Sequence, residues 1–150
     1  MRSVVRMVSK NVLIQYSDLQ EEIKEVRARI NKTEKEISKI ESEGNVVDSV
    51  CGGIGGIQHF RVEGFPYPEY NRKKTLLYAR KATLTSLEME LLETLNSVEE
   101  FIASVKDSRM RRIITLRFID NFSWNEVARH IGGPNTEDSV RKAFERFMEK

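Results

Sequence analysis

Mostly apolar side chains recur along residues 12–43 in alternating steps of three and four. This spacing places them on one face of an α-helix and is typical of a heptad seam. The positions between them are mainly Lys, Glu and Arg, which favour an exposed opposite face. Gly44 follows, with Asn45 next, and predicts the end of the helix. The seam positions are Tyr16, Leu19, Ile23, Val26, Ile30, Thr33, Ile37 and Ile40.

A second apolar stripe runs through residues 70–106 and predicts another long helix. It could pack back on the first helix as an antiparallel hairpin, or pair with a second chain, and periodicity does not choose between these arrangements. The stripe consists of Leu77, Leu84, Leu87, Leu91, Leu95, Val98, Ile102 and Val105.

The segment between the two stripes differs in kind. "CGGIGGI" contains four glycines and is unsuited to a helix or a well-packed strand. "IQHFRVEGF" alternates weakly, which leaves room for a short strand, and "PYP" favours extended or turn geometry. We therefore interpret residues 44–69 as a flexible, glycine-rich connector that can hold a short β-arm.

The stretch "RFIDNFSWNEVARHIGG" contains the start and stop signals of a short helix. Ser123 is a preferred N-cap, and Glu126 three residues later completes a predicted capping box. Phe122 and Val127 stand where a hydrophobic staple requires them. Gly132 and Gly133 can adopt the left-handed backbone that ends a helix, so we predict a helix over residues 124–131.

Two further helices flank this one. Residues 108–119 carry an apolar face formed by Met110, Ile113, Ile114, Leu116 and Phe118. After the glycines, Asn135 or Thr136 can cap a third helix, whose predicted inward face consists of Val140, Phe144 and Phe147. This order is the helix-turn-helix plan, in which Ala128 would face the point where the next helix crosses closely.

Composition narrows the functional classes. Charged residues make up 32% of the chain and the net charge is only +2, but residues 109–150 hold nine Lys/Arg against six Asp/Glu, an excess of three. A single cysteine excludes an internal disulfide and fits a reducing cytoplasm. The apolar runs are too short to span a membrane, and the N-terminus lacks the apolar core of a secretory signal. We find no spacing typical of a metal site, a cofactor-binding loop or a nucleophile–base pair, and expect no enzymatic activity.

The C-terminal residues resemble a known family. "MRRIITLRFIDNFSWNEVARHIGG", followed by "NTEDSVRKAFERF", is similar to region 4 of sigma-70-type RNA polymerase sigma factors. It is more similar still to the small sigma-like regulators of phages and prophages, the ArpU-type and RinA-type late-gene regulators. The resemblance covers residues 107–150 and implies a helix-turn-helix that grips double-stranded DNA through its last helix. No sigma region 2 precedes it, so we do not expect a complete sigma factor.

The resemblance and the helix-turn-helix pattern together assign candidate DNA contacts. We expect Arg141, Lys142 and Arg146 in the major groove or on its flanking phosphates. Arg111, Arg112 and Arg117 could brace the DNA backbone, bind RNA polymerase or merely solvate a helix. Helix starts suit phosphate, although we expect the Trp124 ring itself to pack in the core. Ser123 and Trp124 are the candidates for phosphate, whereas Thr136 and Ser139 stand at the start of the last helix, where base edges are usually met. Asn135, just before that helix, is a further candidate DNA contact.

The sequence thus predicts an all-α protein with two parts. Residues 1–106 would form a long helical hairpin or coiled coil with its connector, and residues 107–150 a helix-turn-helix domain. The leading hypothesis is a cytoplasmic, sequence-specific regulator of phage or prophage late genes that binds as a homo-oligomer, with host RNA polymerase as a further candidate partner. The alternative is a coiled-coil adaptor or structural protein that binds a polymerase subunit or a phage packaging component.

Overall fold

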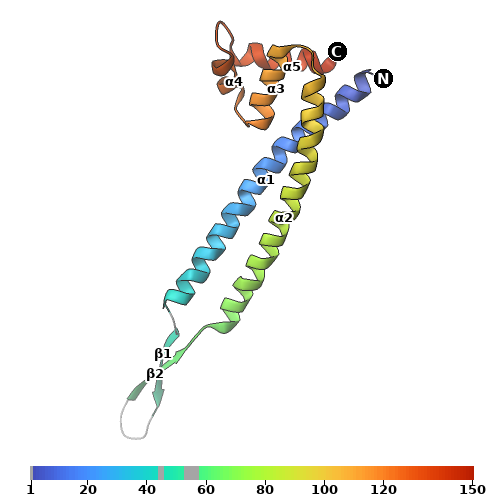
Figure 1. Cartoon of the computed structure of the whole chain (residues 1–150). Helices are drawn as coiled ribbons and strands as arrows, with labels where there is room; N and C mark the ends of the chain where they lie inside the picture. Colours follow the sequence, from blue (N-terminus) through green and yellow to red (C-terminus); the bar gives the residue numbers. More distant parts are fainter. Residues whose placement is uncertain (1, 44–45, 53–57) are drawn as a thin grey trace. The chain divides into compact units, whose positions relative to one another are not determined.

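The computed structural model describes residues 2–43, 46–52 and 58–150, with side chains described for residues 10–43 and 64–150. It is mostly helical, in agreement with the predicted all-α class. Figure 1 labels the elements in chain order. They are α1 (Arg2–Glu43), β1 (Val46–Gly52), β2 (Gln58–Gly64), α2 (Tyr67–Ser104), α3 (Ser108–Ile114), η1 (Thr115–Ile119), α4 (Trp124–Ile131) and α5 (Glu137–Glu149).

The chain divides into two compact units, each built from parts of both long helices. The first unit consists of Met1–Ile23 and Ser86–Lys150, and the second of Lys24–Thr85. The predicted division at residue 106 does not separate these units. The C-terminal helices belong to the same unit as the first part of α1 and the last part of α2.

Helix α1 begins earlier than predicted, at Arg2 rather than Val12. Residues 2–11 contain neither glycine nor proline, so no residue there opposes a helix. The helix ends at Glu43, directly before the predicted stop at Gly44. The predicted seam is buried at every position except Ile40, which is half-buried.

In the second unit, α1 and α2 run antiparallel and are joined by three ion pairs. Lys81 pairs with Glu34 at 3.3 Å, Lys73 with Glu36 at 2.7 Å, and Lys74 with Glu41 at 3.9 Å between nitrogen and oxygen. Glu34 pairs with the later lysine Lys81 of α2, whereas Glu36 and Glu41, farther along α1, pair with the earlier Lys73 and Lys74. Of the two arrangements that the sequence left open, this part of the chain therefore forms the hairpin.

One polar residue, Thr33, is buried at the seam of this hairpin. Its hydroxyl donates a hydrogen bond to the Arg29 carbonyl at 2.9 Å. The same hydroxyl oxygen accepts a bond from the Arg80 guanidinium of α2. The Thr33 hydroxyl thus both donates and accepts a hydrogen bond, which removes the free-energy penalty for burying a polar group.

The strands β1 and β2 pair antiparallel, from Val46 opposite Gly64 to Gly52 opposite Gln58. The predicted glycine-rich centre, residues 53–57, lies outside the described residues. Helix α2 begins at Tyr67, slightly before the predicted Tyr70, and ends at Ser104 rather than Lys106. Pro68 stands in its first turn, where a missing N–H leaves no hydrogen bond unmade.

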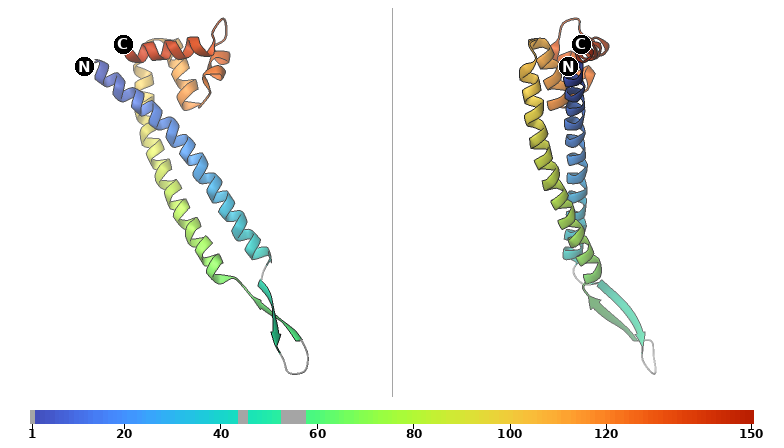
Figure 2. Two further views of the ribbon diagram at one scale, coloured as in Figure 1. Left: turned by 180° about the vertical axis from the view of Figure 1, so that it is seen from behind. Right: turned by 90° about the vertical axis from the view of Figure 1, so that its right-hand side faces the viewer.

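In the first unit, one hydrophobic core joins the long helices to the head, by which we mean residues 107–150. Leu13 and Tyr16 of α1 and Val98 of α2 belong to the same buried cluster as the apolar faces of α3, α4 and α5. Figure 2 shows these three short helices packed beside the end of α2 that precedes them. The head members of the core are Met110, Ile113, Ile114, Phe118, Val127, Ala128, Val140, Phe144 and Met148.

Polar bonds reinforce the attachment of the head to α1. The Gln20 amide donates to the Ile119 carbonyl at 2.9 Å, and the Ser17 hydroxyl donates to the Asn121 side chain at 3.1 Å. The Asn121 amide in turn donates to the Glu21 carboxylate. Asn121 is held with a positive φ of 59°, which Asn adopts more readily than most residues. Burial also raises the pKa of the Tyr16 hydroxyl above its ordinary value, so Tyr16 stays neutral.

We expect replacement of Leu13 to unfold the head, although Leu13 lies far from it in sequence. Leu13 is 0% exposed, so Leu13→Ala should cost about 2–5 kcal/mol of unfolding free energy. The fluorescence of Trp124, the sole tryptophan, reports unfolding of the head in denaturant. Ile14→Ala is the matched control. The Ile14 side chain, next to Leu13 in the sequence, is 43% exposed, so its truncation should cost less than about 1 kcal/mol of unfolding free energy. Equal effects of the two changes would refute the shared core.

The ion pair of Glu36 predicts a pH dependence. The hydrogen bond from Lys73 holds the pKa of the Glu36 carboxyl below its ordinary value. The ion pair therefore stabilises the fold fully at pH values above the ordinary pKa of Glu. This stabilisation is lost as the pH falls through the lowered pKa of Glu36. Glu36→Gln should therefore lower the melting temperature near neutral pH, with a difference from wild type that vanishes in acid. Glu22→Gln, an exposed acid of α1, should show no such pH-dependent difference. Thermal melts followed by circular dichroism test both.

Candidate nucleic-acid interface

The first helix of the head changes its hydrogen-bond register partway along. Asp107 caps α3 by accepting a bond from the Arg109 N–H at 3.0 Å. From Thr115 to Ile119 the chain forms the π-helical turn η1, in which the Asp120 N–H donates to the Thr115 carbonyl at 3.0 Å. The predicted extent of residues 108–119 is confirmed, but the sequence did not predict the π turn.

Helix α4 has the predicted bounds, Trp124–Ile131. The Ser123 hydroxyl accepts a bond from the Glu126 N–H at 3.2 Å, as predicted. Between these two described residues the reciprocal bond of a capping box does not form, so that part of the prediction is wrong. Ala128 is buried, consistent with its predicted place where α4 meets α5.

The turn after α4 depends on two glycines and one asparagine. Gly132 has φ 78° and ψ −171°, a conformation essentially restricted to glycine, and Gly133 has φ 66°. The Asn135 amide donates to the Gly132 carbonyl at 2.6 Å, and its oxygen accepts a bond from the Arg109 guanidinium. Asn135, a predicted DNA contact, therefore closes the turn and ties it to α3.

Thr136, rather than Asn135, caps α5. Its hydroxyl accepts a bond from the Ser139 N–H at 3.2 Å, while the Ser139 hydroxyl accepts one from the Thr136 N–H at 2.8 Å. This reciprocal pair is a complete capping box. The hydroxyls of Thr136 and Ser139, both predicted DNA contacts, thus hold the start of α5 and are exposed.

The inward face of α5 differs from the prediction at its end. Val140 and Phe144 are buried as expected, but Met148 is buried in place of Phe147, which is half-buried. Steps of four from Val140 to Met148 keep these side chains on one helical face. The opposite face carries Lys142 and Arg146, both exposed and four residues apart.

Arg141 is placed differently from these two cations. It is half-buried on the flank of α5, and its guanidinium donates to the Asp138 carboxylate at 2.8 Å. The structure thus brings Lys142 and Arg146 together on the open face of α5, and separates Arg141 as half of an ion pair. Sequence reasoning did not identify Asp138 as its partner.

Two of the predicted backbone-bracing arginines make bonds within the chain. Arg111 donates to the Val105 carbonyl at 2.7 Å and to the Lys106 carbonyl at 3.2 Å. Arg117 donates to the Phe122 carbonyl at 3.1 Å, and its guanidinium lies 5.3 Å from the centre of the Trp124 ring. These bonds fix the loops before α3 and before α4, where no backbone partner satisfies the carbonyls.

The Trp124 ring packs in the core region, as predicted. It is partly buried, and its centre lies 5.5 Å from that of the Phe144 ring. Ser123, the cap of α4, is exposed and remains accessible to an external contact.

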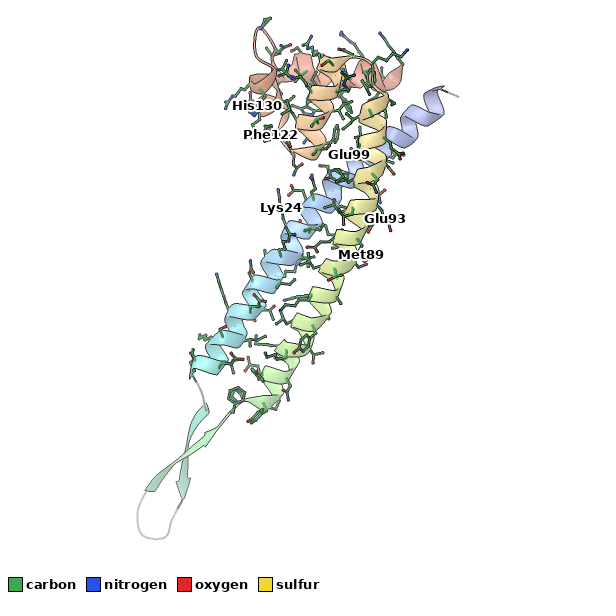
Figure 3. The ribbon with its side chains drawn as sticks, in the orientation of Figure 1. Lys24, Met89, Glu93, Glu99, Phe122 and His130 are labelled. Carbon is green, nitrogen blue, oxygen red and sulfur yellow. The ribbon has the colours of Figure 1, made fainter. Side chains whose placement is uncertain are left out.

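A groove of about 540 Å³ lies between the end of α2, α3 and α4. Arg112, the third predicted bracing arginine, is exposed at this groove together with His130. Figure 3 labels His130 beside Phe122, whose ring centre is 4.7 Å from that of the imidazole. Arg109 and Arg129 are two further exposed cations of the head that the predicted site omitted. The place of Arg109 beside the turn follows from its contact with Asn135. This contact joins residues far apart in the sequence, so local patterns could not predict it.

In the described part of the chain, no group of three or more His, Cys, Asp or Glu side chains is arranged to hold a metal ion. Within the same residues, no helix is long and apolar enough to cross a membrane.

Comparison with known proteins adds no family assignment. No family model, no curated protein and no solved structure matches this chain.

The conformation of Gly132 generates a stability prediction. A Cβ at this position would meet no atom within 4 Å, so backbone strain alone opposes substitution. Gly132→Ala should cost about 1–3 kcal/mol, measured by denaturant unfolding followed through Trp124. Gly64→Ala is the control, because its Cβ would also enter open space without a positive φ. If the two substitutions have the same effect, the assigned turn is incorrect.

Proposed function

We propose that this protein is a sequence-specific, double-stranded DNA-binding transcription regulator, with α5 as its recognition helix. The observation that carries the proposal is the construction of α5. Its start is held by a complete capping box, one face is anchored in the core, and the opposite face presents exposed Lys142 and Arg146. The exposed face also carries Glu145 and Glu149, so the two cations stand among acids. A helix with one face anchored in the core and the other exposed suits the major groove of B-DNA, which admits an α-helix.

The neighbouring residues fit supporting roles. Lys142 and Arg146 would contact guanine edges or phosphates, and the exposed Ser139 hydroxyl lies at the end of α5 where base edges are usually met. The start of α4, with Ser123 as its cap, would receive a phosphate. Arg112 is exposed and would contact the DNA backbone or a protein partner. Arg111 and Arg117 would act indirectly, by fixing the loops that position these helices.

The resemblance to phage sigma-like regulators supports the same function and suggests phage or prophage late genes as its targets. RNA polymerase is the further partner that this resemblance suggests. A homo-oligomer would bind two half-sites at once, and this raises the effective affinity of one small helix-turn-helix.

A second candidate function rests on the exposed apolar side chains of α2. In the first unit Met89 is 61% exposed and Leu92 is 63% exposed, and Figure 3 labels Met89 on the surface of the helix. Such residues suit an adaptor that binds another protein through its long helices. Salt distinguishes the two functions, because binding to phosphates weakens steeply as salt rises and apolar contacts do not.

The double change Lys142→Ala with Arg146→Ala tests the recognition helix. DNA selected by the wild-type protein from a random duplex pool should bind the variant at least about tenfold more weakly. The plot of log affinity against log salt concentration should become less steep by about two, because two phosphate-neutralising charges are lost. Fluorescence anisotropy measures both quantities.

Lys32→Ala with Lys35→Ala is the matched control, because it removes two exposed lysines from α1 instead. Unchanged circular dichroism would show that either variant is folded. If the control loses affinity as much as the α5 variant, or if the wild-type protein enriches no sequence, α5 is not a recognition helix.

A further inference from the structure

The first turn of α5 holds two acids that differ in their contacts. Asp138 accepts a bond from the Arg141 guanidinium at 2.8 Å, and its side chain is 69% exposed. Glu137 is also exposed and stands one residue earlier on the same turn. The two acids carry the same charge on one turn of α5, about 100° apart around the helix axis, and of these two only Asp138 is paired with Arg141.

We propose that Asp138 is a specificity-determining residue, which holds Arg141 and restrains it from neutralising DNA phosphates at non-specific sites. This inference rests on the proposed function, because it concerns the same helix and the same DNA. It adds Asp138 to the proposed DNA interface, although the negative charge of Asp138 alone would be expected only to weaken DNA binding.

The mechanism follows from the donor capacity of arginine. A guanidinium has five N–H donors in a fixed fork, and Asp138 accepts from one terminal nitrogen of Arg141. The paired guanidinium therefore keeps donors that can reach the edge of a guanine. Asp138 also limits the rotamers of Arg141, which lowers the entropy lost when a base contact forms.

A phosphate competes with Asp138 in a different way. To neutralise a phosphate, Arg141 must leave the carboxylate, and the unpaired Asp138 then faces the negative DNA backbone. An exposed ion pair is weak in water. Where DNA excludes solvent, the repulsion between Asp138 and the phosphates adds to the free energy lost when the Asp138–Arg141 pair breaks. Non-specific complexes bear this cost and specific ones do not, so Asp138 increases the ratio between the two affinities.

The experiment compares Asp138→Asn with Glu137→Gln, each of which removes one negative charge from the first turn of α5. Anisotropy titrations use two probes, the duplex selected by the wild-type protein and a duplex of unrelated sequence, over a range of salt. For Asp138→Asn we expect the ratio of selected to unrelated affinity to fall by about tenfold. The salt slope on the unrelated duplex should steepen by about one, since Arg141 is freed for a phosphate.

Glu137→Gln should raise both affinities together and leave their ratio unchanged. In an Arg141→Ala background, Asp138→Asn should behave like Glu137→Gln, because the effect requires the guanidinium. Circular dichroism and Trp124 fluorescence confirm that each variant is folded.

The outcomes separate the two proposals. If wild type binds a selected sequence but Asp138→Asn and Glu137→Gln alter the ratio equally, the role of Asp138 is refuted and DNA binding stands. An effect of Asp138→Asn that persists without Arg141 refutes it as well. If wild type enriches no sequence, both the inference and the proposed function fall.

Discussion

The burial of Leu13 and Val98 together with Ile113 and Ile114 is the constraint on which the first unit depends. The three short helices of the head share this core with one end of α1 and one end of α2. A segment of the size of the head buries only a limited apolar area by itself, and small domains are marginal for that reason. The long helices therefore complete the fold of the head as well as forming a hairpin.

Local signals in the sequence predicted local structure well. The bounds of α4 followed from Ser123 and Gly132, because a cap and a positive-φ glycine act on adjacent residues. Burial of the α1 seam followed from its spacing. The start of α1 was predicted too late. The prediction followed the apolar periodicity, which begins near Val12, and residues 2–11 show only that glycine and proline are absent. The choice between Asn135 and Thr136 as cap depended on which side chain the turn itself used.

Tertiary bonds account for what the sequence could not predict. Nothing near Arg111 indicates that the Val105 carbonyl will need a donor, and nothing near Arg117 indicates the same for Phe122. The sequence left three roles open for both arginines: bracing the DNA backbone, binding RNA polymerase or solvating a helix. The structure assigns each a bond within the chain, and this leaves fewer free cations for phosphates. For the proposed DNA-binding function, the few cations that remain exposed on α5 would make affinity gained through a second half-site more important.

The π turn η1 has a consequence for how this architecture can vary between related sequences. A π turn accommodates one residue more than the α-helix would, and it stands directly before the loop that leads into α4. Because the π turn takes up this extra residue within one turn, loss of a single residue here would restore α-helical hydrogen bonding and leave the flanking segments in nearly the same direction. The placement of α4 and α5 against α3, within the first unit, is therefore tolerant of a one-residue insertion or deletion at this point. A lineage could gain or lose a residue here without disturbing the core that α3, α4 and α5 share.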